Sequence, residues 1–140
     1  MGLRQLHPAA KLERTALTTY TIVPRVVEVR GMPALRLDLG FGTSAFNTDL
    51  VREVEARMLQ LKSDGLGGRP LVMVSGPASL PVLAVIVSHV AHLFGAVAIF
   101  DPKLDGYIVC VTHDPRFAVG ELILASDVAV GASSVEGRGD

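Results

Sequence analysis

The sequence predicts one small α/β domain with a mixed sheet, and three observations carry this prediction. The chain has 140 residues, which is the usual size of a single domain. Hydrophobic residues make up 49% of it, which is enough for a buried core. Residues 71–100 show the order strand, helix, strand, and in such a βαβ unit the two strands run parallel with a right-handed crossover.

The first half of the domain is predicted to contain three strands and one helix. The strands are expected at 18–23, 26–29 and 34–39, and the helix from about Thr48 to Lys62. In the third strand the polar residues Arg36 and Asp38 alternate with leucines, so this strand should be covered on one face only. A glycine- and hydroxyl-rich loop, residues 40–47, precedes the helix.

The second half is predicted to contain the βαβ unit, one antiparallel strand and a short closing strand. The expected ranges are 71–74 for a strand, about 79–94 for a helix, and 96–100, 107–112 and about 121–125 for strands. Residues 101–106 form a short turn that reverses the chain. The domain therefore spans residues 16–125, and residues 1–15 and 126–140 are predicted to be flexible tails.

Charge and composition exclude two classes of nucleic-acid binder. The 13 Lys and Arg against 14 Asp and Glu give a net charge of -1, so no general basic field attracts nucleic acid. With five Phe, two Tyr and no Trp, the chain also lacks the stacked rings of a single-strand binder. We therefore expect no long nucleic-acid partner, and a nucleotide ligand would have to be bound locally.

The uncharged segment 70–100 suggests a membrane span as an alternative. Gly76-Pro77, Pro81 and Gly95 interrupt it, so its longest helical piece falls short of the ~20 residues that cross a bilayer. The N-terminus lacks the apolar stretch of a signal peptide, which favours a cytoplasmic protein. The single Cys110 is predicted to be an inert side chain in a buried strand.

One candidate ligand cradle connects the strand at 71–74 to the following helix. Ser75, Gly76 and Ser79 lie there beside free backbone donors at the positive end of the helix, where a phosphate or ribose can bind. The same residues are also expected if Ser79 is only an ordinary helix N-cap and binds no ligand. No GK[ST] or GxGxxG pattern follows, which excludes a P-loop and a dinucleotide fold. The loop 40–47 is a second candidate of the same kind.

Two histidines and one aspartate are candidates for chemistry. His89 and His92 form an HxxH pattern on an apolar helix, which can supply metal ligands or a general base, although histidines satisfied at an interface explain it equally. Asp101 follows the carboxyl end of a strand, where open α/β sheets bind ligands, but it can also form an Asx turn with Pro102. Lys103 is either a phosphate clamp or a solvated turn residue.

The expected topology separates these groups. The helix brings His92 to the start of strand 96–100, whereas Asp101 lies at its end, so at ~3.3 Å per residue the two are roughly 16 Å apart. His113 ends the antiparallel strand and should return to the His92 side. If His92 and Asp101 act on one bond, the site must be assembled from two molecules.

Four motifs occur in order along the chain: SGPASLP (75–81), HxxH (89–92), FDPKLDGYIVCVTH (100–113) and VGELI (119–123). Together they resemble the small CRISPR-associated ring nucleases of type III systems, most densely over residues 70–123. The resemblance implies a homodimer related to the CRISPR-associated Rossmann-like sensor fold. It also implies that two dimers, in a tetramer or filament, grip the second messenger cyclic tetra-adenylate, linearise it with manganese and so switch off antiviral signalling.

The resemblance also implies residue roles. His92 matches the family's essential histidine and Asp101 its essential aspartate, contributed by facing dimers, and both are expected metal ligands. Lys103 stands where the family commonly has Arg, so the planar two-pronged grip on phosphate is lost. The expected ligand-binding residues are Ser75, Gly76, Ser79, His89 and Lys103. Two alternative functions remain open: a sensor that binds cyclic oligoadenylate without cutting it, and a manganese-dependent RNA exonuclease that trims adenylate tails.

Overall fold

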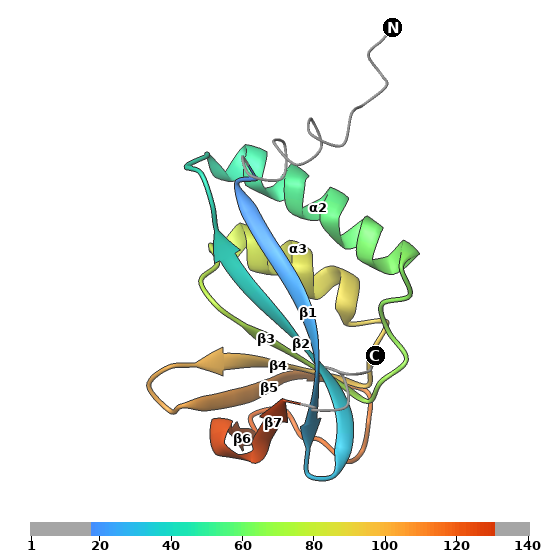
Figure 1. The fold of residues 1–140 in the computed structure, drawn as a ribbon. Coiled ribbons are helices and arrows are strands. Elements are labelled where there is room, and N and C mark those ends of the chain that lie inside the picture. Colours follow the sequence, from blue (N-terminus) through green and yellow to red (C-terminus); the bar gives the residue numbers. More distant parts are fainter. Residues whose placement is uncertain (1–17, 131–140) are drawn as a thin grey trace, which may run out of the picture.

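The structure is a computed structural model that describes residues 18–130 (Figure 1). The strands are β1 (Tyr20–Val29), β2 (Met32–Phe41), β3 (Leu71–Ser75), β4 (Ala96–Asp101), β5 (Gly106–Thr112), β6 (Leu122–Leu124) and β7 (Val128–Val130). The α-helices over this range are α2 (Asn47–Ser63) and α3 (Leu80–Val90), and a 3-10 turn, η1 (Ala125–Asp127), links the last two strands. The predicted mixed α/β fold is confirmed.

All seven strands form one sheet in the order β6-β5-β4-β3-β2-β1-β7. The neighbouring strands β2, β3 and β4 run parallel, and every other pair is antiparallel. The predicted βαβ unit is therefore present as β3, α3 and β4. A second unit, formed by β2, α2 and β3, was not predicted from the sequence. Three parallel strands thus end at the same edge of the sheet.

Both helices pack on one face of this sheet (Figure 1). Each helix presents an apolar stripe at helical spacing, which is what drives it onto the sheet. The buried stripe residues are Leu50, Val54, Met58 and Leu61 in α2 and Val82, Ile86 and Val90 in α3. They share a core with the apolar side chains on the helix side of β1 to β4. This layer holds the starts of both helices at the carboxyl edge of the parallel strands.

A second core fills the opposite face and shows that the sheet is strongly curved. Val27 and Ala34 near one end of the sheet share this core with Tyr107 and Ile123 near the other end. Because η1 has only three residues, β6 and β7 at the two ends of the strand order lie near each other, which makes this face concave. The β6-η1-β7 segment joins the two edges, so the sheet is nearly closed.

One ion pair spans this closure. Arg30, in the turn between β1 and β2, lies with Nη1 2.6 Å from the Glu121 carboxylate, which directly precedes β6. The Arg30 hydrogen bond lowers the pKa of Glu121, and a backbone bond from Ala118 acts in the same direction. The pair ties together segments that are 91 residues apart in the chain.

Three predicted strand features need correction. β1 is one continuous strand instead of two, because Pro24 lies where β1 has only β2 as a neighbour and its missing N–H interrupts no second ladder. β2 is not covered on one face only, since Ala34 is fully buried on the concave side. Cys110 is exposed, not buried, because a register shift between β4 and β5 leaves it out of the paired positions.

Three predicted boundaries also change. α3 ends at Val90 instead of about residue 94, and a turn follows. The predicted C-terminal tail, 126–140, begins too early, because Val128–Val130 pairs with β1 as strand β7. Residues 1–17 and 131–140, which include the predicted N-terminal tail, lie outside the described residues. Over residues 18–130, no helix is long and apolar enough to span a membrane.

Candidate functional site

Asp101 is the last residue of β4 and makes the turn that follows it. Its Oδ1 accepts the backbone N–H of Lys103 at 2.8 Å and of Leu104 at 3.4 Å, so the Asx turn is present. Both bonds use the same oxygen, and Oδ2 accepts no hydrogen bond from any residue between 18 and 130. The carboxylate can therefore hold the turn and still offer one oxygen to a ligand.

A shallow hollow of about 540 Å³ opens beside Asp101. It lies on the helix side of β4 and β5, and its lining residues are Ile99, Phe100, Asp101, Pro102, Lys103, Ile108 and Cys110. Apolar walls with a carboxylate and an ammonium group at one end suit a ligand that has both a flat apolar part and a phosphate. Asp101 and Lys103 thus line the same hollow, and a phosphate-binding role for Lys103 stays a prediction.

His92 stands at the other end of β4, exposed in the turn after α3. His113 holds this turn at two points: its ring Nε2 donates to the Ala91 carbonyl at 2.9 Å, and its backbone N–H donates to the Gly95 carbonyl at 2.7 Å. The prediction that His113 returns to the His92 side is confirmed. His113 therefore fixes the turn that carries His92.

The structure does not bring His92 and Asp101 together. β4 runs from Ala96 to Asp101, so its rise of ~3.3 Å per residue separates its two ends by about 16 Å. Within residues 18–130, no group of three His, Cys, Asp or Glu side chains is placed to hold a metal ion. Within one described chain His92 and Asp101 therefore lie too far apart to share an ion, and the expected metal site, which requires two copies, stays a prediction.

His89 has a structural partner on each ring nitrogen. Nε2 lies 2.6 Å from the Glu55 carboxylate and Nδ1 lies 3.0 Å from the Lys62 ammonium, both on α2. The tautomer with hydrogen on Nε2 satisfies both contacts, and only 10% of the side chain is exposed. His89 therefore matches the alternative of a histidine whose hydrogen bonds are satisfied at a helix interface. A ligand-binding role for His89 stays a prediction.

Ser75, Gly76 and Ser79 lie at the carboxyl edge of β3, where the cradle was expected. Gly76 has φ +115° and packs so closely on β2 that a Cβ would lie 2.2 Å from the Leu39 carbonyl oxygen. The Ser79 hydroxyl accepts the Val82 N–H at 3.3 Å as an N-cap and donates to Asn47 at 2.7 Å. The N-cap alternative is therefore realised, and the hydroxyl also fixes the start of α2.

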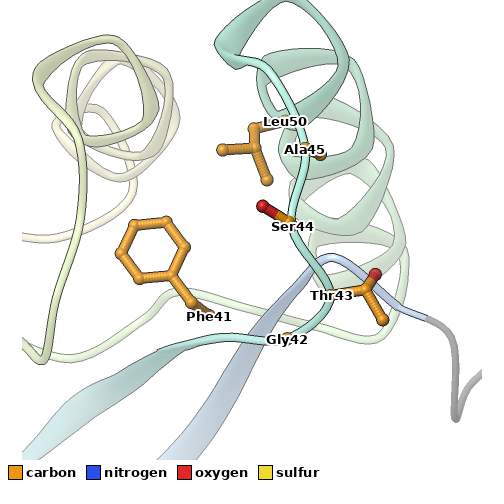
Figure 2. A pocket seen from close by; sticks show the side chains of 6 residues that line it. All are labelled: Phe41, Gly42, Thr43, Ser44, Ala45 and Leu50. Atoms are coloured by element: carbon orange, nitrogen blue, oxygen red, sulfur yellow. The ribbon is translucent and has the colours of Figure 1, made fainter.

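The second candidate cradle, the loop 40–47, borders a pocket of about 300 Å³ (Figure 2). Its lining residues are Phe41, Gly42, Thr43, Ser44, Ala45 and Leu50. In Figure 2 the Phe41 ring and the Ser44 hydroxyl project into the hollow, whereas Thr43 points away. Gly42 is required here because a Cβ would lie 2.0 Å from the Thr18 carbonyl oxygen. The pocket and the Ser75–Ser79 loop flank the same sheet edge.

The structure also contains an arginine pair that the sequence reasoning missed. Arg36 donates to Asp38 through Nε at 2.7 Å and Nη2 at 3.2 Å, and Arg25 donates to the same carboxylate through Nε at 2.8 Å. The Asp38 hydrogen bond raises the pKa of Arg36, against burial, and Tyr107 adds to the rise. Sequence alone shows no such cluster, because it depends on the register of β1 and β2.

Comparison with known proteins adds the family. A family model described as CRISPR-associated protein (Cas_csx3) matches residues 48–124, more than half of the chain. The chain belongs to this CRISPR-associated Csx3 family. No curated protein and no solved structure matches it.

The segment matched to the Csx3 family contains α2 except its first residue, α3, and the strands from β3 to β6. His92, Asp101 and Lys103 therefore all lie in the part of the chain that defines the family match. Arg25, Arg36 and Asp38 precede it.

Proposed function

We propose that this Csx3 family protein is a metal-dependent phosphodiesterase, a ring nuclease that binds cyclic tetra-adenylate and linearises it. Cutting this messenger would switch off type III CRISPR antiviral signalling. The observation that carries the proposal is the Asp101 end of β4, where one carboxylate oxygen and Lys103 border an apolar hollow. Family membership supports the CRISPR setting. The sequence resemblance to ring nucleases supports the messenger and the chemistry.

The chemistry needs few groups. An RNA-like phosphodiester carries its own nucleophile in the 2′-hydroxyl, so the protein has to align it, move protons and offset the charge that develops on phosphorus. His92 is exposed and can transfer a proton. The Lys103 ammonium can hold a phosphate oxygen, and the adenine base can occupy the apolar walls of the hollow.

The 16 Å separation along β4 makes a shared site part of the proposal. His92 of one copy would meet Asp101 of a second copy, so the active form is a pair of stacked homodimers around the ligand. Manganese belongs to this shared site, because imidazole nitrogen and carboxylate oxygen are donors that such an ion accepts. When bound, the ion offsets negative charge on the phosphate.

The proposal is tested by incubating the protein with cyclic tri-, tetra- and hexa-adenylate and manganese, followed by chromatography. We expect linear products from cyclic tetra-adenylate, no turnover in excess chelator, and recovery when manganese is added back. Tight binding of an uncut ring would favour the sensor alternative. Shortening of linear adenylate tails with intact rings would favour the exonuclease.

A further inference from the structure

The mouth of the concave face carries a charged cluster at the carboxyl end of the parallel strands. Arg25 on β1 and Arg36 on β2 are directly opposite each other in the antiparallel register. Arg25 is two residues from Val27 and Arg36 is two residues from Ala34, and both of these apolar residues belong to the concave core. Residues two apart in a strand lie on the same face, so the two arginine side chains are on the concave face. Asp38, two residues beyond Arg36, joins the two guanidinium groups.

The arrangement places two positive charges side by side on one face of the sheet. Like charges that are directly opposite on neighbouring strands destabilise a sheet. One carboxylate offsets only one of the two arginine charges, which leaves a net positive cluster. The Arg36 side chain is only 21% exposed, so a charge is held largely away from water. A pair of like charges that is only partly offset is a feature found at binding sites.

The donors of the cluster are oriented in advance. Asp38 holds Arg36 by two bonds and Arg25 by one, and Tyr107 on β5 interacts with Arg36 across the concave face. The Nη1 and Nη2 groups of Arg25 donate to no other residue in the described range 18–130. They therefore remain available to an anion.

The neighbours of the cluster also suit a phosphorylated ligand. Ser75 is register-paired with Asp38 on the adjacent strand, so a hydroxyl stands beside the carboxylate. Phe100 and Tyr107 form an edge-to-face ring pair at 5.2 Å and both pack with the concave core. Two aromatic rings therefore lie on the same face of the sheet as the arginine pair.

We propose that Arg25, Asp38 and Arg36 form a phosphate-binding site on the concave face of the sheet. Guanidinium groups match tetrahedral phosphate oxygens in both charge and geometry. A phosphomonoester carries about 1.5 to 2 negative charges at neutral pH and so competes better with the resident Asp38 carboxylate than a singly charged anion does. The sheet separates this site from the Asp101 hollow, and the inference does not rest on the proposed function.

Calorimetric titration of the full chain tests the site, with inorganic phosphate, adenosine monophosphate and adenosine as probes at matched ionic strength. We expect both phosphates to bind and adenosine, which lacks the anion, to bind at least about tenfold more weakly, the usual effect of one charge-assisted hydrogen bond. A sodium chloride titration at the same ionic strength controls for general screening.

Variants assign the binding to the cluster. Arg36→Gln and Arg25→Gln should each weaken phosphate binding by about tenfold or more. Arg52→Gln is the matched control, since Arg52 is 76% exposed and pairs only with Asp49 within residues 18–130. If Arg36→Gln does not fold, Arg36→Lys keeps the charge and loses the two-pronged geometry, and it should also bind more weakly.

Three results would overturn the site. One is the absence of phosphate binding beyond the chloride control. Another is equal affinity in the wild type, the Arg36 variants and Arg52→Gln. The third is adenosine binding as tightly as adenosine monophosphate, because the phosphate group would then contribute nothing to binding.

Discussion

At the end of β4, Asp101 is bonded into its own turn, whereas at the start of β4 His92 stands in a turn that other residues hold. The Asp101 carboxylate accepts two backbone N–H groups, and only its second oxygen is available. The turn of His92 is fixed by His113 through the carbonyls of Ala91 and Gly95. Under the proposed function, Asp101 therefore both holds its turn and acts on the ligand, whereas at the other end His113 holds the turn and His92 acts on the ligand.

The largest expected effect separates these two roles. His92→Ala, Asp101→Ala and Asp101→Asn should each lower the rate of ring cleavage by about 100-fold or more, the usual reach of proton-transfer and charge-stabilising groups. Only Asp101→Ala should also lower the thermal midpoint, because Asn keeps the oxygen that accepts the turn bonds. Rates by chromatography and unfolding by circular dichroism check both expectations. An unchanged rate in Asp101→Asn would contradict a chemical role for the carboxylate.

A smaller effect is expected at the rim of the hollow. Lys103→Ala should weaken ligand binding by about tenfold, the worth of one charge-assisted contact, with little change in the rate at saturating ligand. Lys103→Arg should bind more tightly than the wild type, since it restores two parallel donors to phosphate. Binding and single-turnover assays separate the two quantities. An unchanged dissociation constant in Lys103→Ala would remove this residue from the ligand site.

The smallest expected effect concerns the Arg30–Glu121 ion pair, which closes the sheet and contacts neither His92 nor Asp101. Arg30 lowers the pKa of Glu121 below its ordinary value of 4.5, so the pair stabilises the fold above that pH and loses this contribution as pH falls through the lowered pKa. The pair is partly exposed, and screening keeps the effect below about 1 kcal/mol. Glu121→Gln should therefore show a flatter loss of stability below about pH 4.5 in acid unfolding, whereas a slope equal to that of the wild type would contradict the pairing.

Elements set by local sequence patterns are predictable from the sequence, whereas elements set by long-range pairing are not. The βαβ unit is predictable because the apolar runs of β3 and β4 and the Ser79 cap of α3 are local patterns. β7 is not, because its three residues are ordered by pairing with β1, which lies about 100 positions earlier in the chain. The parallel pairing of β2 with β3 depends on a long-range contact in the same way.

The candidate sites divide along the same line. Asp101 and His92 are found from sequence because each lies at a strand or helix end that local pattern marks. The arginine pair and the exposure of Cys110 are not, because both depend on strand register, and a shift of one residue reverses the face of a side chain.

The measurement that tests the account most directly is the mixing of two inactive variants. His92→Ala and Asp101→Asn proteins each lack one half of the shared site, but a contact between them pairs an intact Asp101 with an intact His92. We predict that the mixture cleaves cyclic tetra-adenylate with manganese, and that its rate rises more than linearly with protein concentration at fixed ligand excess. If both variants fold and bind the ring, yet no mixture exceeds the sum of its parts, the site is not shared between copies.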